Sequence, residues 1–310
     1  MSKFLSRETL SGTWGTVLLP LRPDDTIDRP RLLDELDVLA AAGLDGVYAH
    51  GTAGEFHELD DDEFQQVNEL VAERFAGRPV QIGAGHMSAR ACLRRVAMAR
   101  AVEPGAIQVT LPDWVPLSRS EVLTFLERAA EVADPVPLVL YNPPHAKTQV
   151  GPDEYAVLAE RLPALIGMKV AGGDPAWYAE ITGKAGDLAL FVAGHTLATG
   201  TELGAKGSYS NIAALNPTGA MAWQRLIRSD GAAARDVERR IARFFAEYVA
   251  PLQAEGYSNP ALDKFLAHVG GWADLGTRIR WPYRSVDEAY ALRLRPIARA
   301  DLPELFPDAR

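Results

Sequence analysis

One lysine lies inside an apolar run of this sequence. Lys169 follows Leu-Ile-Gly-Met, and burial lowers the pKa of a lysine because it penalises the charged amine. A neutral amine can attack a ketone and form a protonated imine, an electron sink that lets a neighbouring carbon–carbon or carbon–oxygen bond break. The alternative is a lysine whose stem is buried while its amine reaches solvent or pairs with a carboxylate. The spacing alone favours neither interpretation.

A glycine-rich loop, Gly51-Thr52-Ala53-Gly54-Glu55, follows another apolar run. Its glycines let consecutive backbone N–H groups turn toward one small anion such as a carboxylate. A plain tight turn explains the loop equally well on its own. Together with Lys169 it matches the needs of a 2-oxo acid, which are an amine for the ketone and a cradle for the carboxylate. Glu55 could orient the loop or cap the following helix, and we expect the cap.

Tyr141 ends a third apolar run, directly before Asn-Pro-Pro. A phenol beside an imine can donate and accept protons as a general acid and base. A tyrosine at such a place can equally be an amphipathic residue with its hydroxyl in water. In combination with Lys169 and the glycine-rich loop, Tyr141 completes a predicted imine-forming site.

Length and composition limit the class of protein. The chain has 310 residues, of which 47% are hydrophobic and 24% are charged, as in soluble globular proteins. Its net charge of -9 disfavours a nucleic-acid or anionic-membrane partner, because phosphate contacts need a basic face. We find no signal peptide and no apolar stretch of about twenty residues. The single cysteine, Cys92, is interpreted as a small buried hydrophobe and favours a cytoplasmic location.

Short apolar runs alternate with amphipathic segments up to about residue 215. Near-continuous apolar runs are typical of parallel strands that are buried on both faces. The expected strands are 14–19, 46–50, 80–84, 106–110, 138–141, 166–170, 190–193 and 207–210, and helix candidates are 30–42, 61–75, 89–102, 120–133 and 152–161. Eight such units favour a (β/α)8 TIM barrel over an open doubly wound sheet. In a barrel, the residues that end the strands form the active site.

Helical spacing of apolar residues continues beyond the last expected strand. No linker rich in Ser, Gly or charge separates this part from the barrel. We therefore predict a barrel over residues 1–215, and the last barrel helix with a C-terminal helical subdomain packed on the barrel over residues 216–310.

Three motifs, in this order, resemble those of the dihydrodipicolinate synthase and N-acetylneuraminate lyase superfamily of Schiff-base barrel enzymes. Residues 51–55 match its GxxGE carboxylate loop, residues 141–144 match its YN-x-P motif, and Lys169 matches its imine lysine. The resemblance covers nearly the whole chain. It implies a metal-independent class I lyase or aldolase without a cofactor, acting on pyruvate or a pyruvate-derived sugar acid. It also implies a homotetramer or homodimer.

The resemblance and the positions at strand ends suggest a set of site residues. Lys169 would form the imine, Tyr141 would move protons, and Thr52 with the backbone of Gly51 and Ala53 would hold the substrate carboxylate. Tyr209 takes the strand-eight position that lines the pocket in the family, where its bulk would shrink the cavity. Further substrate contacts are expected from residues that follow strand ends: His145, His195, Ser210 and Asn211.

Three departures from the family pattern concern the substrate. Ala53 replaces a hydroxyl residue of the carboxylate loop, Trp114 stands where the synthases usually have a tyrosine, and Lys147 lies where an arginine is expected. Trp114 and Lys147 are nevertheless candidate substrate-binding residues, although a lysine lacks the bidentate fork of an arginine. These departures disfavour the lysine-biosynthesis reaction. They favour a lyase for another 2-oxo acid, or a sugar-acid dehydratase that uses the same imine.

Two other classes of function compete with this hypothesis. A metal-dependent hydrolase is suggested by His50, His86, His145 and His195 near strand ends, but the sequence contains no HxH or HExxH motif. A non-catalytic ligand-binding protein on the same scaffold is favoured by Ala53 and Trp114. The presence of Lys169 argues against it, because a buried amine that is not used is costly.

Overall fold

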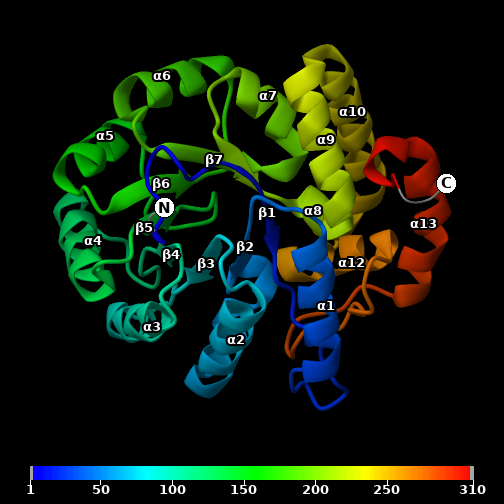
Figure 1. Ribbon diagram of the computed structural model, residues 1–310, viewed down its shortest axis with the longest axis horizontal. Coiled ribbons are helices and arrows are strands. Elements are labelled where there is room, and N and C mark those ends of the chain that lie inside the picture. Colours follow the sequence, from blue (N-terminus) through cyan, green and yellow to red (C-terminus); the bar gives the residue numbers. More distant parts are fainter. Residues whose placement is uncertain (1–2, 308–310) are drawn as a thin grey trace.

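The computed structural model describes residues 3–307, and its eight parallel strands form a closed barrel in the order β1 to β8. Helices surround this barrel on the outside (Figure 1). The barrel closes where Trp14 of the first strand pairs with Tyr209 of the last strand. The strands are β1 (Gly12–Thr16), β2 (Gly46–Ala49), β3 (Val80–Gly83), β4 (Ala106–Thr110), β5 (Leu138–Tyr141), β6 (Leu165–Lys169), β7 (Ala189–Ala193) and β8 (Gly207–Tyr209).

Helices follow the strands around the barrel and then continue as a helical tail. The helices that accompany the strands are α1 (Arg29–Ala41), α2 (Asp61–Arg74), α3 (Ala89–Ala101), α4 (Arg119–Ala133), α5 (Pro152–Arg161), α6 (Pro175–Ala185), α7 (Leu197–Glu202) and α8 (Asn211–Leu215). The tail contains α9 (Pro217–Ser229), α10 (Gly231–Phe244), the π-helical turn η4 (Phe245–Val249), α11 (Ala250–Ala254), α12 (Asn259–Gly270) and α13 (Glu288–Asp301). Four 3-10 turns complete the set: η1 (Thr52–Gly54), η2 (Phe56–Glu58), η3 (Gly194–Thr196) and η5 (Pro303–Leu305).

The predicted TIM barrel with a C-terminal helical extension is confirmed. Seven of the eight expected strands agree with β2 to β8 to within one residue at each end, but β1 begins two residues earlier than predicted and ends at Thr16. The apolar run continues past Thr16 because this segment is buried outside the sheet. There the backbone N–H of Leu18 donates to the buried carboxylate of Glu35 at 2.7 Å.

Local sequence signals fix several helix ends. Asp60 caps α2 by accepting a hydrogen bond from the backbone of Glu63 at 2.8 Å, and Ser118 forms a reciprocal capping box with Glu121 at the start of α4. Gly43 has a φ of +76° after α1, a conformation that glycine adopts without steric cost. Each of these helix ends is therefore determined by residues close to it in the sequence.

The interior of the barrel is filled mainly by large side chains, as expected for a TIM barrel. This inner cluster contains Leu10, Trp14, Tyr48, Ala106, Val139, Ile166, Ala189, Phe191 and Tyr209. The aromatic rings of Tyr48 and Tyr209 meet edge to face, with centroids 4.9 Å apart. They form the floor under the carboxyl ends of the strands.

The helical tail, yellow to red in Figure 1, covers one side of the barrel. It has its own apolar cluster, which includes Trp223, Ile241 and Phe265 and extends to Leu197 of α7. The tail follows α8 directly, since α9 begins two residues after α8 ends. The division at residues 215 and 216 into two units stays a prediction, although this position does coincide with the end of α8.

Two smaller expectations concern the cysteine and the membrane. Cys92 is free and fully buried in the outer core, and burial raises the pKa of its thiol to about 12. Its predicted role as a small buried hydrophobe is therefore confirmed. Within residues 3–307, none of the helices has the length and apolar character needed to span a bilayer.

Candidate active site

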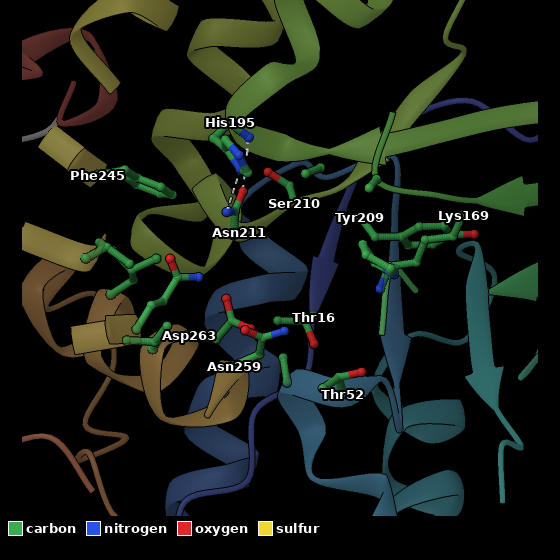
Figure 2. Close-up of a pocket in the computed structure, with 18 of the residues that line it drawn as sticks. Thr16, Thr52, Lys169, His195, Tyr209, Ser210, Asn211, Phe245, Asn259 and Asp263 are labelled. Carbon is green, nitrogen blue, oxygen red and sulfur yellow. Dashed lines mark hydrogen bonds between the residues drawn. The ribbon is translucent and has the colours of Figure 1, made fainter. Parts of the chain in front are cut away.

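A cavity of about 600 Å³ lies between the carboxyl ends of the strands and the helical tail. Its barrel side is formed by residues at or just after strand ends, and its outer side by α10, η4, α11 and α12. Figure 2 shows this cavity with its principal side chains. The lining residues used below are Thr16, Tyr48, Thr52, Ala53, Tyr141, Lys169, His195, Tyr209, Ser210, Asn211, Phe245, Gln253, Asn259 and Asp263.

Lys169 is the last residue of β6, and its amine lies among aromatic rings. The Nζ atom is 4.1 Å from the ring centroid of Tyr141, and 5.0 Å and 5.2 Å from those of Tyr48 and Tyr209. Burial lowers the pKa of Lys169 to about 8, and the negative charge of Asp263 opposes this shift. No carboxylate among residues 3–307 forms an ion pair with Lys169. At pH 7 a minor fraction of the amine is therefore neutral, and this fraction grows as the pH approaches 8; only the neutral amine can act as a nucleophile.

Tyr141 is positioned beside Lys169 by the register of the sheet. It ends β5, and its Cα pairs directly with that of Lys169 on β6. Burial raises the pKa of the Tyr141 phenol, while a hydrogen bond with the side chain of Thr52 opposes the shift. The phenol is thus protonated at neutral pH, and it can donate a proton at a position next to the amine.

The glycine-rich loop forms a single helical turn against the cavity. The N–H groups of Gly54 and Glu55 are bonded to the carbonyls of Gly51 and Thr52, both at 3.0 Å. The N–H groups of Thr52 and Ala53 stand at the start of this turn, where helical donors have no partner within the helix. Gly51 is not among the residues that line the cavity, and a Cβ atom there would come within 2.6 Å of the Tyr48 ring. The loop can therefore offer the Thr52 hydroxyl and backbone donors to an anion.

The expectation that the Glu55 side chain caps a helix is wrong, whereas the alternative that it orients the loop agrees with the structure. Asp60 caps α2, and the side chain of Glu55 accepts instead from Nζ of Lys264 at 2.6 Å and from the backbone of Arg280 at 3.1 Å. The ion pair is fully buried, with side-chain exposures of 1% for Glu55 and 0% for Lys264. It ties the carboxylate loop to α12, which also lines the cavity. No local pattern reveals this pairing, because its partners are 209 residues apart.

Tyr209 points inward and lines the cavity, as its strand-eight position suggested. Its hydroxyl donates to Oε1 of Gln81 at 2.7 Å, and burial raises the pKa of the phenol. Because this hydroxyl already has a partner within the barrel, Tyr209 serves as an aromatic wall rather than as a second proton carrier.

His195 is held in one orientation by Asn211, as the dashed lines in Figure 2 show. The amide oxygen of Asn211 accepts from the backbone of His195 at 3.0 Å, and its nitrogen lies 2.9 Å from Nδ1 of the ring. Since that nitrogen can only donate, Nδ1 carries no proton and Nε2 does. Burial lowers the pKa of His195, whose ring packs at 5.3 Å from that of Phe245. Ser210 instead caps α8 through the backbone of Ala213.

Trp114 and Lys147 are not brought to Lys169. The Trp114 side chain is 75% exposed, and the amine of Lys147 lies 4.9 Å from its ring centroid and donates to its carbonyl at 3.0 Å. Neither residue lines the cavity. Their contact is a surface cation–π pair in the loops after β4 and β5.

The histidines at the strand ends are dispersed. His50 is buried against Asn68 at 2.9 Å, and burial lowers its pKa to about 3. His86 and His145 line a second cavity of about 140 Å³, whose lining shares Thr52 and Tyr141 with the first. Within the part of the chain that the structure describes, no three His, Cys, Asp or Glu side chains are grouped as metal ligands would be.

The sequence interpretation missed the part of the cavity wall that the tail supplies. Asn259 and Asp263 of α12 and Gln253 of α11 all line the cavity. Asn259 and Asp263 are four residues apart, so they lie on the same face of their helix. Their spacing on a largely apolar helix was a usable signal, but it could not reveal that this face turns toward the barrel.

This barrel, with a buried lysine amine at its centre, resembles known proteins in sequence and in fold. Residues 9–301 match the Dihydrodipicolinate synthetase family, and the chain belongs to this family. A 4-hydroxy-tetrahydrodipicolinate synthase from Thermomicrobium roseum is 31% identical over 60% of this chain and 61% of that protein. A probable 5-dehydro-4-deoxyglucarate dehydratase from Bradyrhizobium diazoefficiens is 30% identical over 63% and 62%. The chain thus spans about six tenths of the length of each relative.

The fold is also shared with solved structures. YagE, a prophage protein of the dihydrodipicolinic acid synthase family from Escherichia coli K12, was crystallised in complex with pyruvate. It superimposes with a TM-score of 0.83 over 94% of this chain and 98% of its own, at 21% identity. The suspected family resemblance is therefore confirmed for both sequence and fold.

Proposed function

We propose that this protein is a class I lyase or aldolase that acts on a 2-oxo acid through a Schiff base on Lys169. The observation that carries the proposal is the Lys169 amine, which is enclosed by three tyrosine rings, lacks an ion-pair partner among the described residues and has a pKa lowered to about 8. An amine in these surroundings is suited to nucleophilic attack on a ketone.

Imine formation needs one proton donor, and Tyr141 supplies it. The neutral amine of Lys169 adds to the ketone carbon and forms a carbinolamine. The nitrogen lone pair then expels the hydroxyl, which takes a proton from Tyr141 and leaves as water. The products of this step are a protonated imine and the Tyr141 phenolate. The position of Tyr141, 4.1 Å from Nζ to ring centroid, suits this transfer.

The substrate carboxylate is held by the loop after β2. The Thr52 hydroxyl and the N–H of Ala53 are the donors on the cavity side, with Gly51 allowing the turn to approach Tyr48. Ala53 supplies a methyl group buried beside Leu18 instead of a second hydroxyl. Tyr209 closes the opposite wall, and His195 with Asn211 faces the distal part of the substrate.

The protonated imine at C2 of the substrate can accept the electrons of the C3–C4 bond. In an aldol cleavage the phenolate takes the proton of the substrate's C4 hydroxyl, the C3–C4 bond breaks, and an aldehyde leaves an enamine behind. Protonation at C3 and hydrolysis then release pyruvate. The pyruvate complex of the structurally similar YagE protein supports this substrate class.

A sugar-acid dehydratase is the second candidate, supported by the relative named as a probable dehydratase. Here the same imine makes the C3 proton acidic, and the C4 hydroxyl leaves as water. The synthase reaction of lysine biosynthesis is disfavoured, because Ala53 lacks a hydroxyl and Lys169 is the only lysine or arginine among the described residues that line the cavity. A homotetramer or homodimer and a cytoplasmic location stay predictions.

Product analysis tests the proposal and separates its two candidates. Purified protein is incubated with 4-hydroxy-2-oxo acids in the presence of EDTA. An aldolase releases pyruvate, whereas a dehydratase yields a product lighter by one water. Loss of all activity in EDTA, with recovery on adding a divalent metal, would contradict the metal-independent mechanism.

A further inference from the structure

The far end of the cavity is built by the helical tail and has polar groups without partners. Asn259 and Asp263 of α12, with Gln253 of α11, line this end. Among residues 3–307, none of these three side chains has a hydrogen bond or ion pair with another group. Figure 2 shows Asn259 and Asp263 reaching from α12 toward Thr16, on the side of the cavity away from Lys169. Polar groups that face a cavity in this way are available to a ligand.

The charges around the cavity are unequally placed. Lys169 is the only lysine or arginine among the described lining residues, and the imine mechanism uses it for the ketone. His195 adds no positive charge, since burial lowers its pKa and Asn211 occupies Nδ1. Asp263 is the only acidic residue among the described lining residues. Burial raises its pKa to about 7, so that it is largely ionised at pH 8.

A second carboxylate on the substrate would therefore have no cationic partner at the far end and would face Asp263. Like charges in a partly desolvated site repel each other strongly. Hydroxyl groups suit the same surface, because they donate to the Asp263 carboxylate and both donate to and accept from the amides of Asn259 and Gln253. The N–H at Nε2 of His195 provides another donor to a substrate oxygen.

We propose that Asp263, with Asn259 and Gln253, forms a distal subsite that selects a 2-oxo acid with one carboxylate and a hydroxyl-bearing tail, and rejects a second carboxylate. This inference rests on the proposed function for the position of the ketone at Lys169. The cavity of about 600 Å³ is in the range of sites for drug-sized ligands, and it is larger than a three-carbon acid needs. Cleavage and dehydration can both act on such a substrate, but the subsite would exclude a dicarboxylate such as the 5-dehydro-4-deoxyglucarate for which the Bradyrhizobium diazoefficiens relative is named.

A matched pair of ligands tests the subsite. 3-Deoxy-2-oxohexonate ends in an alcohol, whereas 3-deoxy-2-oxohexarate has the same carbon chain and ends in a carboxylate. Binding of both is measured by calorimetry at pH 8 on the full chain, and pyruvate is included because it has neither a tail nor a second carboxylate. We expect the wild-type protein to bind the hexonate at least about tenfold more tightly than the hexarate.

Variants of the protein test whether Asp263 causes the preference for the hexonate over the hexarate. Asp263→Asn keeps the shape and removes the charge, and it is expected to reduce the preference about tenfold. Asn259→Asp adds a second negative charge and is expected to increase the preference. Glu247→Gln is the control, because it changes net charge equally at an exposed position of η4 that does not line the cavity. Using the ratio of the two affinities within each variant cancels any effect of Asp263 on the Lys169 amine.

The proposal of a distal subsite would be overturned if the wild-type protein bound the two acids with equal affinity. It would also be overturned if Asp263→Asn left the preference unchanged. Borohydride trapping of pyruvate reports on Lys169 separately. If pyruvate is trapped while the preference is absent, only this inference fails. If pyruvate is not trapped while the preference depends on Asp263, the imine mechanism fails and the subsite stands. Thermal unfolding of each variant verifies that it is folded.

Discussion

Glu55 and Lys264 form a fully buried ion pair, with 2.6 Å between the carboxylate and the amine. The pair joins the loop that faces the substrate carboxylate to helix α12, whose Asp263 faces the far end of the same cavity. A single contact thus fixes both ends of the proposed site relative to each other. The helical tail is in this way part of the active site and not only a cover for the barrel.

Breaking this ion pair should destabilise the folded protein. Replacing one partner leaves an uncompensated buried charge, so Lys264→Met or Glu55→Gln is expected to lower the free energy of unfolding by about 3–5 kcal/mol. The double variant removes both charges and should cost clearly less than the sum of the single variants. Urea unfolding of the four proteins measures this coupling. Additive losses would show that the two charges do not interact.

Tyr141→Phe should separate imine formation from proton transfer. The variant keeps the ring beside Lys169 but lacks the hydroxyl, and removal of a general acid and base typically slows turnover by about 10²–10⁴-fold. Trapping of pyruvate by borohydride should persist at a reduced rate. Tyr155→Phe is the matched control, since the Tyr155 hydroxyl is buried in α5 without a partner among the described residues. Equal activity of the two variants would remove Tyr141 from the mechanism.

The rate of imine formation should depend on pH through the Lys169 amine. Only the neutral amine attacks, so the rate should rise with pH and level off above the pKa of about 8. The charge of Asp263 raises this pKa, and Asp263→Asn should therefore move the inflection to lower pH. Pyruvate trapping across a pH series gives both curves. An inflection near the ordinary lysine pKa of 10.5 would mean that Lys169 is not desolvated.

Local sequence signals predicted much of this structure, because apolar runs and helical spacing are visible within short stretches of sequence. The placement of Lys169, Tyr141 and Thr52 around one cavity was predictable as well, since all parallel strands of a barrel end on the same side. Trp114 and Lys147 illustrate the limit. Their positions depend on how two loops pack, and family motifs do not determine loop conformation.

The helical tail shows the same limit more strongly. Asp263 and Lys264 are neighbours in the sequence, yet one faces the cavity and the other pairs with Glu55. Helical periodicity predicts which residues share a face, but only tertiary packing decides what each face meets. The ion pair and the distal subsite could therefore be found only in the folded chain.

Asn211 should control the protonation of His195. Asn211→Asp places a carboxylate oxygen beside Nδ1, so the proton is expected to move from Nε2 to Nδ1 and the pKa of His195 to rise. Nitrogen NMR of the labelled imidazole distinguishes the two tautomers. Because Nε2 would then lose its proton as a donor to the substrate, affinity for a hydroxylated 2-oxo acid should fall while pyruvate trapping continues. An unchanged tautomer would contradict this arrangement.

Borohydride reduction in the presence of pyruvate tests the Schiff base on Lys169 most directly. Peptide mass spectrometry should find the peptide containing Lys169 heavier by the mass of pyruvate minus one oxygen atom, as expected for a reduced imine. Lys169→Ala should abolish the modification, and Lys206→Ala, which removes a lysine at the far end of the barrel from the cavity, should keep it. Modification of other lysines with Lys169 unmodified, or no modification with any 2-oxo acid, would contradict the mechanism.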